Sequence, residues 1–271
     1  MNTKDILNDN NFTFKKRFGQ NFLLDQNILN NIVKLADITK DTLVIEVGVG
    51  AGALTKKLAL NAKRVLGYEI DKTLKEPLIE ILKEYDNIDI IYDDFLNRDI
   101  ALDIKKYNYD KIYVVANLPY YITTPIITKF INEKINVEKI IVMVQNEVAD
   151  RFSAKVATKS YNSLSIFLNY YFDIKKAFTV SRNVFYPKPT VDSAVVVFTK
   201  KEKKPYLKDE SLFFKLVKDA FSKKRKTLKN NLKNYDLEKI DIVLKKHDKN
   251  ISFRAEQITI DEFIDIANNL N

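Results

Sequence analysis

The chain has 271 residues, of which 46% are hydrophobic and 30% charged, a balance typical of a globular protein with one large domain or a large and a small one. No apolar run is long enough to cross a bilayer, and residues 1–12 lack the features of a secretory signal. We therefore expect a soluble protein with no membrane partner. The absence of cysteine excludes disulfides and thiolate metal sites and favours a reducing cytoplasm, and we expect no metal site.

The net charge of +9 fits a polyanionic partner, because each Lys or Arg that neutralises a phosphate releases a counterion on binding. An organism whose proteins are generally rich in Lys, Ile and Asn would produce the same excess. Charge alone therefore leaves the partner open.

Mostly apolar segments, typical of strands, alternate with segments whose apolar residues have helical spacing. The expected strands are residues 43–47, 64–70, 88–94, 111–118 and 137–145, and the expected helices between the first three are 53–62 and 73–85. Residues 163–180 and 191–200 predict two further strands on either side of a proline-containing loop. This order predicts an α/β fold with a doubly wound parallel sheet of about seven strands and an antiparallel partner at one edge.

The composition changes at residues 200–210, a charged stretch with Pro205 that is typical of a linker. Beyond it, residues 212–232 predict a helix with Ser211 as its N-cap, followed by two shorter helices. We therefore expect a catalytic domain over residues 1–200 and a small all-helical domain over 201–271.

Three of the five glycines in the chain cluster after the first expected strand, as Gly48, Gly50 and Gly52. A strand that ends in G-x-G-x-G before a helix lets the backbone approach a ligand closely. An ordinary tight turn is the alternative. Glu69 favours a ligand-binding loop over an ordinary turn, because a carboxylate at the end of the second strand can accept hydrogen bonds from both hydroxyls of an adenosine ribose.

The third expected strand also ends in acidic residues, and Asp94 can accept a hydrogen bond from an adenine amine. The glycine loop, Glu69 and Asp94 together predict an adenosine pocket. S-adenosylmethionine fits this pocket better than NAD or ATP, because it carries no phosphates and the chain shows neither a Walker-type lysine nor the G-x-G-x-x-G fingerprint.

The sequence NLPY ends the fourth expected strand, beside this pocket. The side-chain oxygen of Asn117 and the carbonyl of Leu118 or Pro119 can accept the two hydrogens of an adenine N6 amine. Pro119 would stiffen the turn, and Tyr120 offers a ring for a flipped base, a stacking contact of roughly 1 to 3 kcal/mol. A strand-ending turn with buried tyrosines is the alternative for the tetrapeptide alone.

A basic segment, Lys223, Lys224, Arg225 and Lys226, lies in the expected helical domain. Such a run is usually a solvated helix face, with Phe221, Leu228 and Leu232 forming the buried stripe here. The density of positive charge favours contact with an RNA backbone.

The chain resembles the universal small-subunit ribosomal RNA adenine dimethyltransferases over nearly its whole length. The resemblance rests on six motifs in the family's order and approximate spacing: KKRFGQNFL, EVGVGAGALT, NLPYYITTPII, VFYPKPTVDSAVV, FSKKRKTLKNNL and RAE. It implies a Rossmann-like class I methyltransferase domain and a helical RNA-recognition domain. It also implies transfer of methyl groups from S-adenosylmethionine to N6 of two adjacent adenines in a hairpin loop near the 3′ end of 16S rRNA.

The resemblance also assigns residues. The family's cofactor contacts correspond to Asn21, Leu23, Gly48, Glu69, Asp94 and Asn117, and its aromatic residue over the active site corresponds to Phe185. The alternative for Phe185 is a structural role in a loop shaped by prolines. The chain departs from the family at Val49, where proline is frequent, and at Lys224, where arginine is common. The second departure would soften RNA contacts, because lysine lacks the planar fork of arginine.

Three rival functions stay open on sequence alone. An Erm-type 23S rRNA methyltransferase would share the cofactor pocket, but NLPY, KRKTLKNNL and RAE favour the small-subunit enzyme. A DNA adenine methyltransferase would more typically carry a D/N-P-P-Y/F motif, so no DNA partner is expected. The third is an assembly factor of the 30S subunit with incidental methylation. We expect a monomer, since nothing indicates an obligate dimer.

Overall fold

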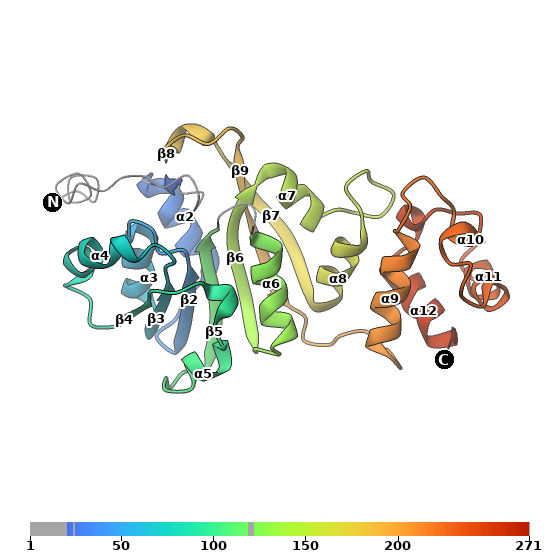
Figure 1. Cartoon of the computed structure of the whole chain (residues 1–271), viewed down its shortest axis with the longest axis horizontal. Coiled ribbons are helices and arrows are strands. Elements are labelled where there is room, and N and C mark those ends of the chain that lie inside the picture. The colour runs from blue at the N-terminus through green and yellow to red at the C-terminus, as the bar shows by residue number, and fades with distance from the viewer. Residues whose placement is uncertain (1–20, 24, 119–121, 271) are drawn as a thin grey trace. The chain divides into compact units, whose positions relative to one another are not determined.

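The structure is a computed structural model that describes residues 21–23, 25–118 and 122–270 (Figure 1). The chain divides into two compact units, each with its own hydrophobic core. Unit 1 comprises Met1–Ala149 and Lys175–Thr199, and unit 2 comprises Asp150–Ile174 and Lys200–Asn271.

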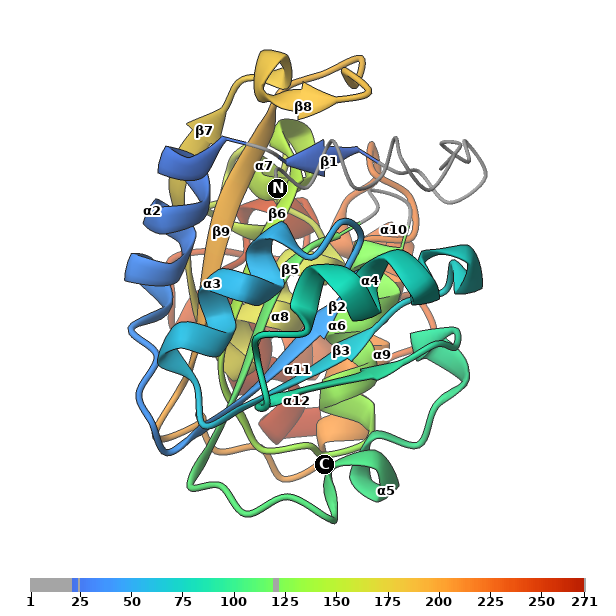
Figure 2. The same cartoon turned by 90° about the vertical axis from the view of Figure 1, so that its left-hand side faces the viewer.

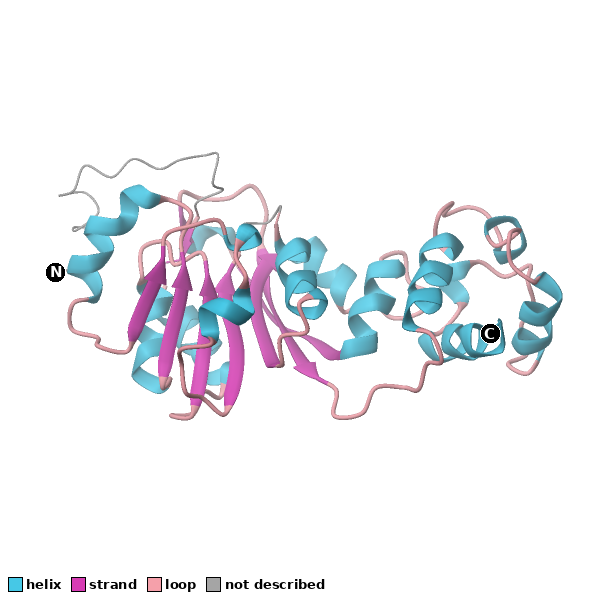
Figure 3. Cartoon of the chain, turned by 60° about the horizontal axis from the view of Figure 1, so that its bottom comes forward, coloured by secondary structure: helices cyan, strands magenta, loops and turns pink. Residues whose placement is uncertain are grey.

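The main sheet, magenta in Figure 3, has seven strands among the described residues. Their order is β4-β3-β2-β5-β6-β9-β7. Its strands are β2 (Thr42–Val47), β3 (Arg64–Tyr68), β4 (Ile88–Ile91), β5 (Lys111–Asn117), β6 (Val137–Gln145), β7 (Phe172–Val180) and β9 (Ser193–Lys200). Strands β2 to β6 pair in parallel and β9 pairs antiparallel to β6. The predicted parallel sheet is confirmed, but the antiparallel strand lies one place in from the edge, because β7 takes the edge position.

The helices of unit 1 follow its strands in the expected alternation. They are α2 (Gln26–Ala36), α3 (Ala53–Asn61), α4 (Lys75–Leu82), α5 (Ile100–Ile104) and α6 (Thr123–Asn132), while α7 (Asn146–Phe152) crosses the unit boundary. Helix α2 begins where the Asp25 carboxylate accepts hydrogen bonds from the amides of Asn27 and Ile28. Helices α2 and α3 bury their apolar residues against one face of the sheet, in a cluster that includes Val44, Val115 and Ile141.

A second, very small sheet joins segments more than 160 residues apart in sequence. Strand β1 (Phe22–Leu23) pairs antiparallel with β8 (Phe185–Tyr186), and the two lie together in Figure 2. The sequence did not predict this pair, because two-residue strands carry no readable hydrophobic period.

Unit 2 is built from α8 (Ser163–Tyr171), α9 (Glu210–Ala220), α10 (Leu228–Asn231), α11 (Leu237–Lys245) and α12 (Ile260–Leu270). Ile166 and Tyr170 of α8 share a core with residues of the C-terminal helices. Residues 150–174 therefore fold with the helical unit, whereas the sequence-based boundary at residue 200 assigned them to the first domain.

Two predicted elements differ from the structure. Residues 163–180 form helix α8 followed by strand β7, not one strand, because a capping box between Asn162 and Ser165 starts a helix. The continuous helix predicted over 212–232 is also wrong. Helix α9 begins after Asp209, which is the N-cap instead of Ser211, and ends at Ala220, so the basic segment lies in turns between α9 and α10.

Candidate active site

The glycine loop and Glu69 come together at the end of β2. Gly48, Gly50 and Gly52 all have positive φ angles, of 81°, 56° and 73°, which explains the need for glycine in this turn. The Gly50 amide donates a hydrogen bond to Glu69 Oε2 at 2.8 Å. The Asp71 amide donates to Glu69 Oε1, also at 2.8 Å. The predicted pairing of the glycine loop with Glu69 is thus present as a direct contact.

The loop glycines have different neighbours. A Cβ atom at Gly50 would lie 3.1 Å from Cε1 of Phe22 in β1, so the ring of Phe22 packs on the loop. A Cβ at Gly52 would lie 3.2 Å from Leu78 of α4, which gives this glycine a role in helix packing. The side chain of Val49 packs against Gly67 of β3. A Cβ atom at Gly67 would lie only 2.5 Å from Cγ2 of Val49.

Glu69 is 5% exposed, and burial raises its pKa, while hydrogen bonds from the amides of Asp71 and Gly50 oppose the rise. Each carboxylate oxygen accepts one amide hydrogen and retains a further lone pair. The carboxylate is therefore oriented by the backbone and still able to accept hydrogen bonds from two hydroxyl groups.

Sequence reasoning missed a second buried acid, Glu46, which lies in β2 two residues before Gly48. It is 1% exposed, and burial raises its pKa to about 8, with Thr55 opposing the rise and the charge of Glu69 adding to it. Thr55 is near enough to affect Glu46, yet neither Glu46 Oε2 nor Thr55 Oγ1 has a hydrogen-bond partner of good geometry among the described residues. An acid inside an otherwise apolar strand was the available signal.

Asp94 stands at the end of β4, where it caps a 3-10 helix of Phe95–Asn97. Its Oδ1 accepts the Leu96 amide at 2.9 Å, which leaves Oδ2 for another donor. Phe95 anchors this turn between Tyr68 and Phe130, with ring centroids 5.0 and 5.3 Å away. These contacts explain how the carboxylate is positioned.

An ion pair that the sequence did not reveal lies beside this turn. Arg98 binds Asp103 through two nitrogens at 2.5 and 3.1 Å, and the hydroxyl of Tyr68 donates to the same carboxylate at 3.1 Å. Burial acts to raise the pKa of Asp103, but the hydrogen bonds from Arg98 and Tyr68 hold it below its ordinary value. The carboxylate is thus kept charged and ties β3 to the segment after Asp94.

Asn117 ends β5, and its side chain bridges to the start of the described chain. Asn117 Nδ2 donates to the backbone oxygen of Asn21 at 3.1 Å. The amide oxygen is consequently the group left to accept a hydrogen from a ligand. Leu118 is 2% exposed, with its amide donating to the carbonyl of Met143 at 3.3 Å. Pro119 and Tyr120, the other predicted members of NLPY, lie outside the described residues.

Leu23 and Phe185 are direct partners in the β1–β8 pair. The structure therefore brings a predicted cofactor residue against a predicted base-stacking residue. Both are buried, at 5% exposure each, in the core cluster of unit 1. Stacking of a base on Phe185 stays a prediction, and it would require that the ring become uncovered.

The basic residues Lys223, Lys224, Arg225 and Lys226 are exposed in unit 2. The segment after these basic residues is anchored by Leu228 and Leu232, two buried leucines of the predicted apolar stripe. The charges thus lie on turns instead of on one helix face, and turn residues can point their side chains in several directions.

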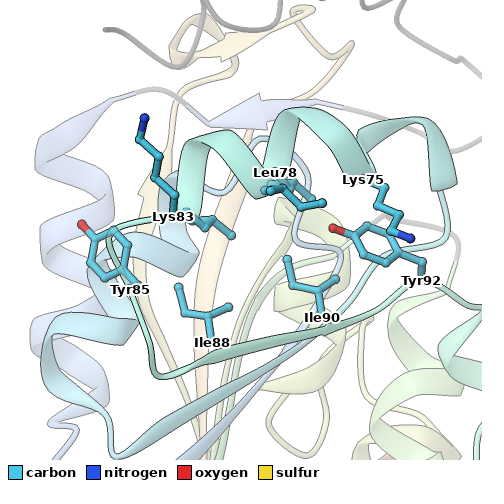
Figure 4. A pocket seen from close by; sticks show the side chains of 9 residues that line it. Lys75, Leu78, Lys83, Tyr85, Ile88, Ile90 and Tyr92 are labelled. Atoms are coloured by element: carbon cyan, nitrogen blue, oxygen red, sulfur yellow. The ribbon is translucent and has the colours of Figure 1, made fainter.

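An open pocket of about 250 Å³ lies between α4 and the edge strand β4 (Figure 4). Its floor is formed by Ile88 and Ile90, and Lys75, Lys83, Tyr85 and Tyr92 lie around it. None of the predicted cofactor residues lines it. Its lining contains no carboxylate to accept hydrogen bonds from the ribose hydroxyls, so we do not assign it to the cofactor.

A parallel sheet of this order with the glycine loop at the end of β2 defines a class I methyltransferase fold. Two solved structures share it. One is a dimethyladenosine transferase from Plasmodium falciparum, with a TM-score of 0.77 and 28% identity, covering 90% of this chain and 95% of that one. The other is the 23S rRNA methyltransferase ErmE, with a TM-score of 0.75 and 23% identity, covering 92% of this chain and 99% of that one.

Sequence comparison defines the family within this class. A sequence profile described as ribosomal RNA adenine dimethylase matches residues 11–271. The chain is 44% identical to the ribosomal RNA small subunit methyltransferase A of Oceanobacillus iheyensis, over 98% of this chain and 93% of that protein. It is 47% identical to the protein of the same name from Streptococcus mutans, over 99% of this chain and 95% of that protein. The chain therefore belongs to the ribosomal RNA adenine dimethylase family.

Proposed function

We propose that this protein transfers methyl groups from S-adenosylmethionine to N6 of two adjacent adenines in the 3′-terminal hairpin loop of 16S rRNA. The products are N6,N6-dimethyladenines, and the substrate is the 30S subunit during its biogenesis. The family membership supports the reaction class, and the names of the relatives support the small subunit as the target.

The observation that carries the proposal is the orientation of Asn117. Because Nδ2 donates to the carbonyl of Asn21, Oδ1 is the atom that can accept a hydrogen from an adenine N6 amine. A donor in that position would repel the amine instead. The side chain is thus held in the polarity that the reaction requires.

The residues around the glycine loop fit S-adenosylmethionine. Glu69 has lone pairs left for two ribose hydroxyls, and Asp94 has an oxygen left for the adenine amine. The cofactor, when bound, supplies an electrophilic methyl group. Asn21, Leu23, Gly48, Gly50 and Gly52 are the remaining proposed contacts of the pocket.

We assign the handling of the substrate amine to NLPY. Asn117 and the backbone of Leu118 or Pro119 accept its two hydrogens. These hydrogen bonds help the nitrogen become tetrahedral, so that its lone pair is no longer delocalised into the adenine ring. Tyr120 and Phe185 hold the flipped base by stacking. A general base is not required, because the methylated cationic amine is strongly acidic and loses its proton readily.

Unit 2 would bind the RNA backbone through Lys223, Lys224, Arg225 and Lys226, and the protein would act as a monomer in the cytoplasm. No helix among the described residues is long and apolar enough to cross a membrane. Replacing Lys223, Lys224 and Arg225 by Ala should weaken 30S binding and flatten its salt dependence, with affinity for S-adenosylmethionine unchanged. A salt slope equal to that of the wild type would contradict this assignment.

The test of the reaction offers labelled S-adenosylmethionine together with undermethylated 30S subunits, 23S rRNA or duplex DNA, and then maps the product. We expect label in 30S subunits, at two adjacent adenines of 16S rRNA. Label in 23S rRNA alone would support the Erm-type alternative. That alternative is not separated by fold, since the TM-scores of 0.77 and 0.75 are nearly equal.

A further inference from the structure

The segment Lys155–Lys159 connects α7 to α8 in unit 2 and can be followed in Figure 1 between these labels. All five of its residues are exposed. At its centre Ala157 has a φ angle of 63°, in the left-handed region that a residue with a side chain rarely adopts. An exposed loop with no constraint would relax from such a conformation, so other contacts must maintain it.

Those contacts come from the RAE motif and from the basic segment Lys223–Lys226. The Ala157 amide donates to the carbonyl of Glu256, in the RAE motif, at 2.8 Å. Lys224 Nζ donates to the carbonyl of Lys159 at 3.3 Å. Within the loop, the hydroxyl of Thr158 donates to the carbonyl of Lys155 at 2.6 Å. The loop is therefore fixed to the basic segment on one side and to the RAE motif on the other.

Tyr161, two residues after the loop, strengthens this attachment. The hydroxyl of Tyr161 donates to the carbonyl of Ile258 at 3.0 Å, and its ring meets Phe221 edge-on with centroids 6.0 Å apart. Tyr161 is 8% exposed. The loop thus leaves from a buried anchor, and its position relative to Lys223–Lys226 is set by the core of unit 2.

Ion pairs within the described part of the chain leave the charge of the loop unneutralised. No ion pair among the described residues involves the side chain of Lys155 or Lys159, nor those of Lys223, Arg225 and Lys226. Lys224 uses its amine on a carbonyl, not on a carboxylate. Two segments that are far apart in sequence, joined by the Lys224–Lys159 contact, thus carry six exposed cationic side chains. A polyanion is the partner that matches this charge.

We propose that Lys155 and Lys159 form a second phosphate-binding element of the RNA surface, and that the backbone of Ala157 holds them in position for it. This inference rests on the proposed function, since it specifies how the same unit grips ribosomal RNA. A loop ordered before binding loses little entropy when it meets the RNA. Phosphate contacts of this kind position the substrate and carry no sequence information.

The test measures binding of undermethylated 30S subunits to the full-length protein at several salt concentrations. In the double variant Lys155→Ala/Lys159→Ala, we expect the slope of log affinity against log salt to fall by about 1.4 to 1.8, and affinity at 0.15 M salt to fall roughly 10- to 30-fold. A matched control, Lys239→Ala/Lys246→Ala, removes the same charge from α11 and the residue after it and should change the slope little. A double variant that keeps the wild-type slope would overturn the proposal.

Variants of Ala157 test whether the backbone matters while both lysines stay in place. Ala157→Gly permits the positive φ without strain and should retain wild-type binding. Ala157→Pro forces φ to about −65° and removes the amide that bonds Glu256, so it should weaken binding as the lysine variant does. Equal binding by the glycine and proline variants would refute the positioning role, provided that circular dichroism shows both variants folded.

The outcomes also separate this inference from the proposed function. If wild-type protein neither binds 30S subunits nor methylates their RNA, the proposed function fails. If the wild type does both, and only the Lys223/Lys224/Arg225 variant changes the salt slope, the proposed function stands and the second element is absent.

Discussion

Replacing Glu46 by glutamine should make the unfolding free energy of this protein less dependent on pH. Glu46 is buried in β2, two residues before Gly48, and its folded-state pKa of about 8 exceeds the ordinary value of 4.5. Between these two pH values the folded protein holds a proton that the unfolded chain has released. Stability therefore falls as pH rises from about 4.5 to 8, with a slope of at most about 1.4 kcal/mol per pH unit.

The size of the effect follows from the interval between the two pKa values. Multiplying the difference between 8 and 4.5 by the slope gives a loss of about 5 kcal/mol in fully ionising this carboxyl. Glutamine has nearly the same shape and carries no charge, so it avoids the loss. Its amide can also donate to Thr55 Oγ1, which lacks a hydrogen-bond partner of good geometry among the described residues.

The assay compares thermal unfolding of wild type and Glu46→Gln between pH 5 and pH 9. As pH rises, the Tm of the variant should increase relative to that of the wild type. The increase should be roughly 2 to 4 °C for each kcal/mol of unfolding free energy that the wild type loses. Glu76→Gln serves as the control, since Glu76 is an exposed carboxylate on α4 of the same unit. Parallel Tm curves for wild type and Glu46→Gln across this range would refute a protonated Glu46.

Three further predictions concern the site. Gly50→Ala should destabilise the protein by about 1 to 2 kcal/mol and weaken S-adenosylmethionine binding in calorimetry. The reason is that φ is 56° at this position and that the new methyl group would meet the ring of Phe22. Unchanged stability and affinity would mean that the loop adapts freely. Asn117→Ala should abolish methyl transfer but leave 30S binding nearly intact in a sedimentation assay, and joint loss would assign the residue a structural role. Asp103→Asn should cost about 2 to 3 kcal/mol in denaturant unfolding by breaking the paired contact with Arg98, and a cost below 0.5 kcal/mol would show that solvent replaces it.

The parallel sheet could be predicted because its central strands, β2 and β5, are buried on both faces. All six residues of β2 are buried, so the strand stands out as an apolar run that needs no partner to be recognised. Helix α8 was hidden for the opposite reason. Its aromatic and branched residues favour a strand, and only the Asn162 cap and the core of unit 2 make it helical.

The break between α9 and α10 also depends on distant residues. The amide of Leu228 donates to the carbonyl of Phe253 at 2.8 Å, and the amide of Lys229 donates to that of Ile251 at 2.9 Å. These bonds draw the chain away from the axis of α9. No glycine or proline marks the break in the sequence, so local propensity indicated a continuous helix.

For the site, the predictable contacts were those fixed by a repeated chain geometry. Adjacent parallel strands end at the same edge of a sheet, so Glu69 at the end of β3 had to lie near a loop that follows β2. The pairing of β1 with β8 and the Arg98–Asp103 contact obey no such rule. They join short segments through side-chain and edge contacts whose partners a single sequence does not reveal.

The bond between Asn117 and Asn21 links these two kinds of contact. An amide side chain can present either its oxygen or its nitrogen, and β5 alone does not determine which. The carbonyl of Asn21 accepts from Nδ2, so reversing the amide would bring two oxygens together and leave the nitrogen facing the substrate amine. Asn21 is held next to Phe22, whose strand pairs with β8 and whose ring packs on Gly50. Which atom of the Asn117 amide faces the substrate thus depends on a residue 96 positions earlier in the chain.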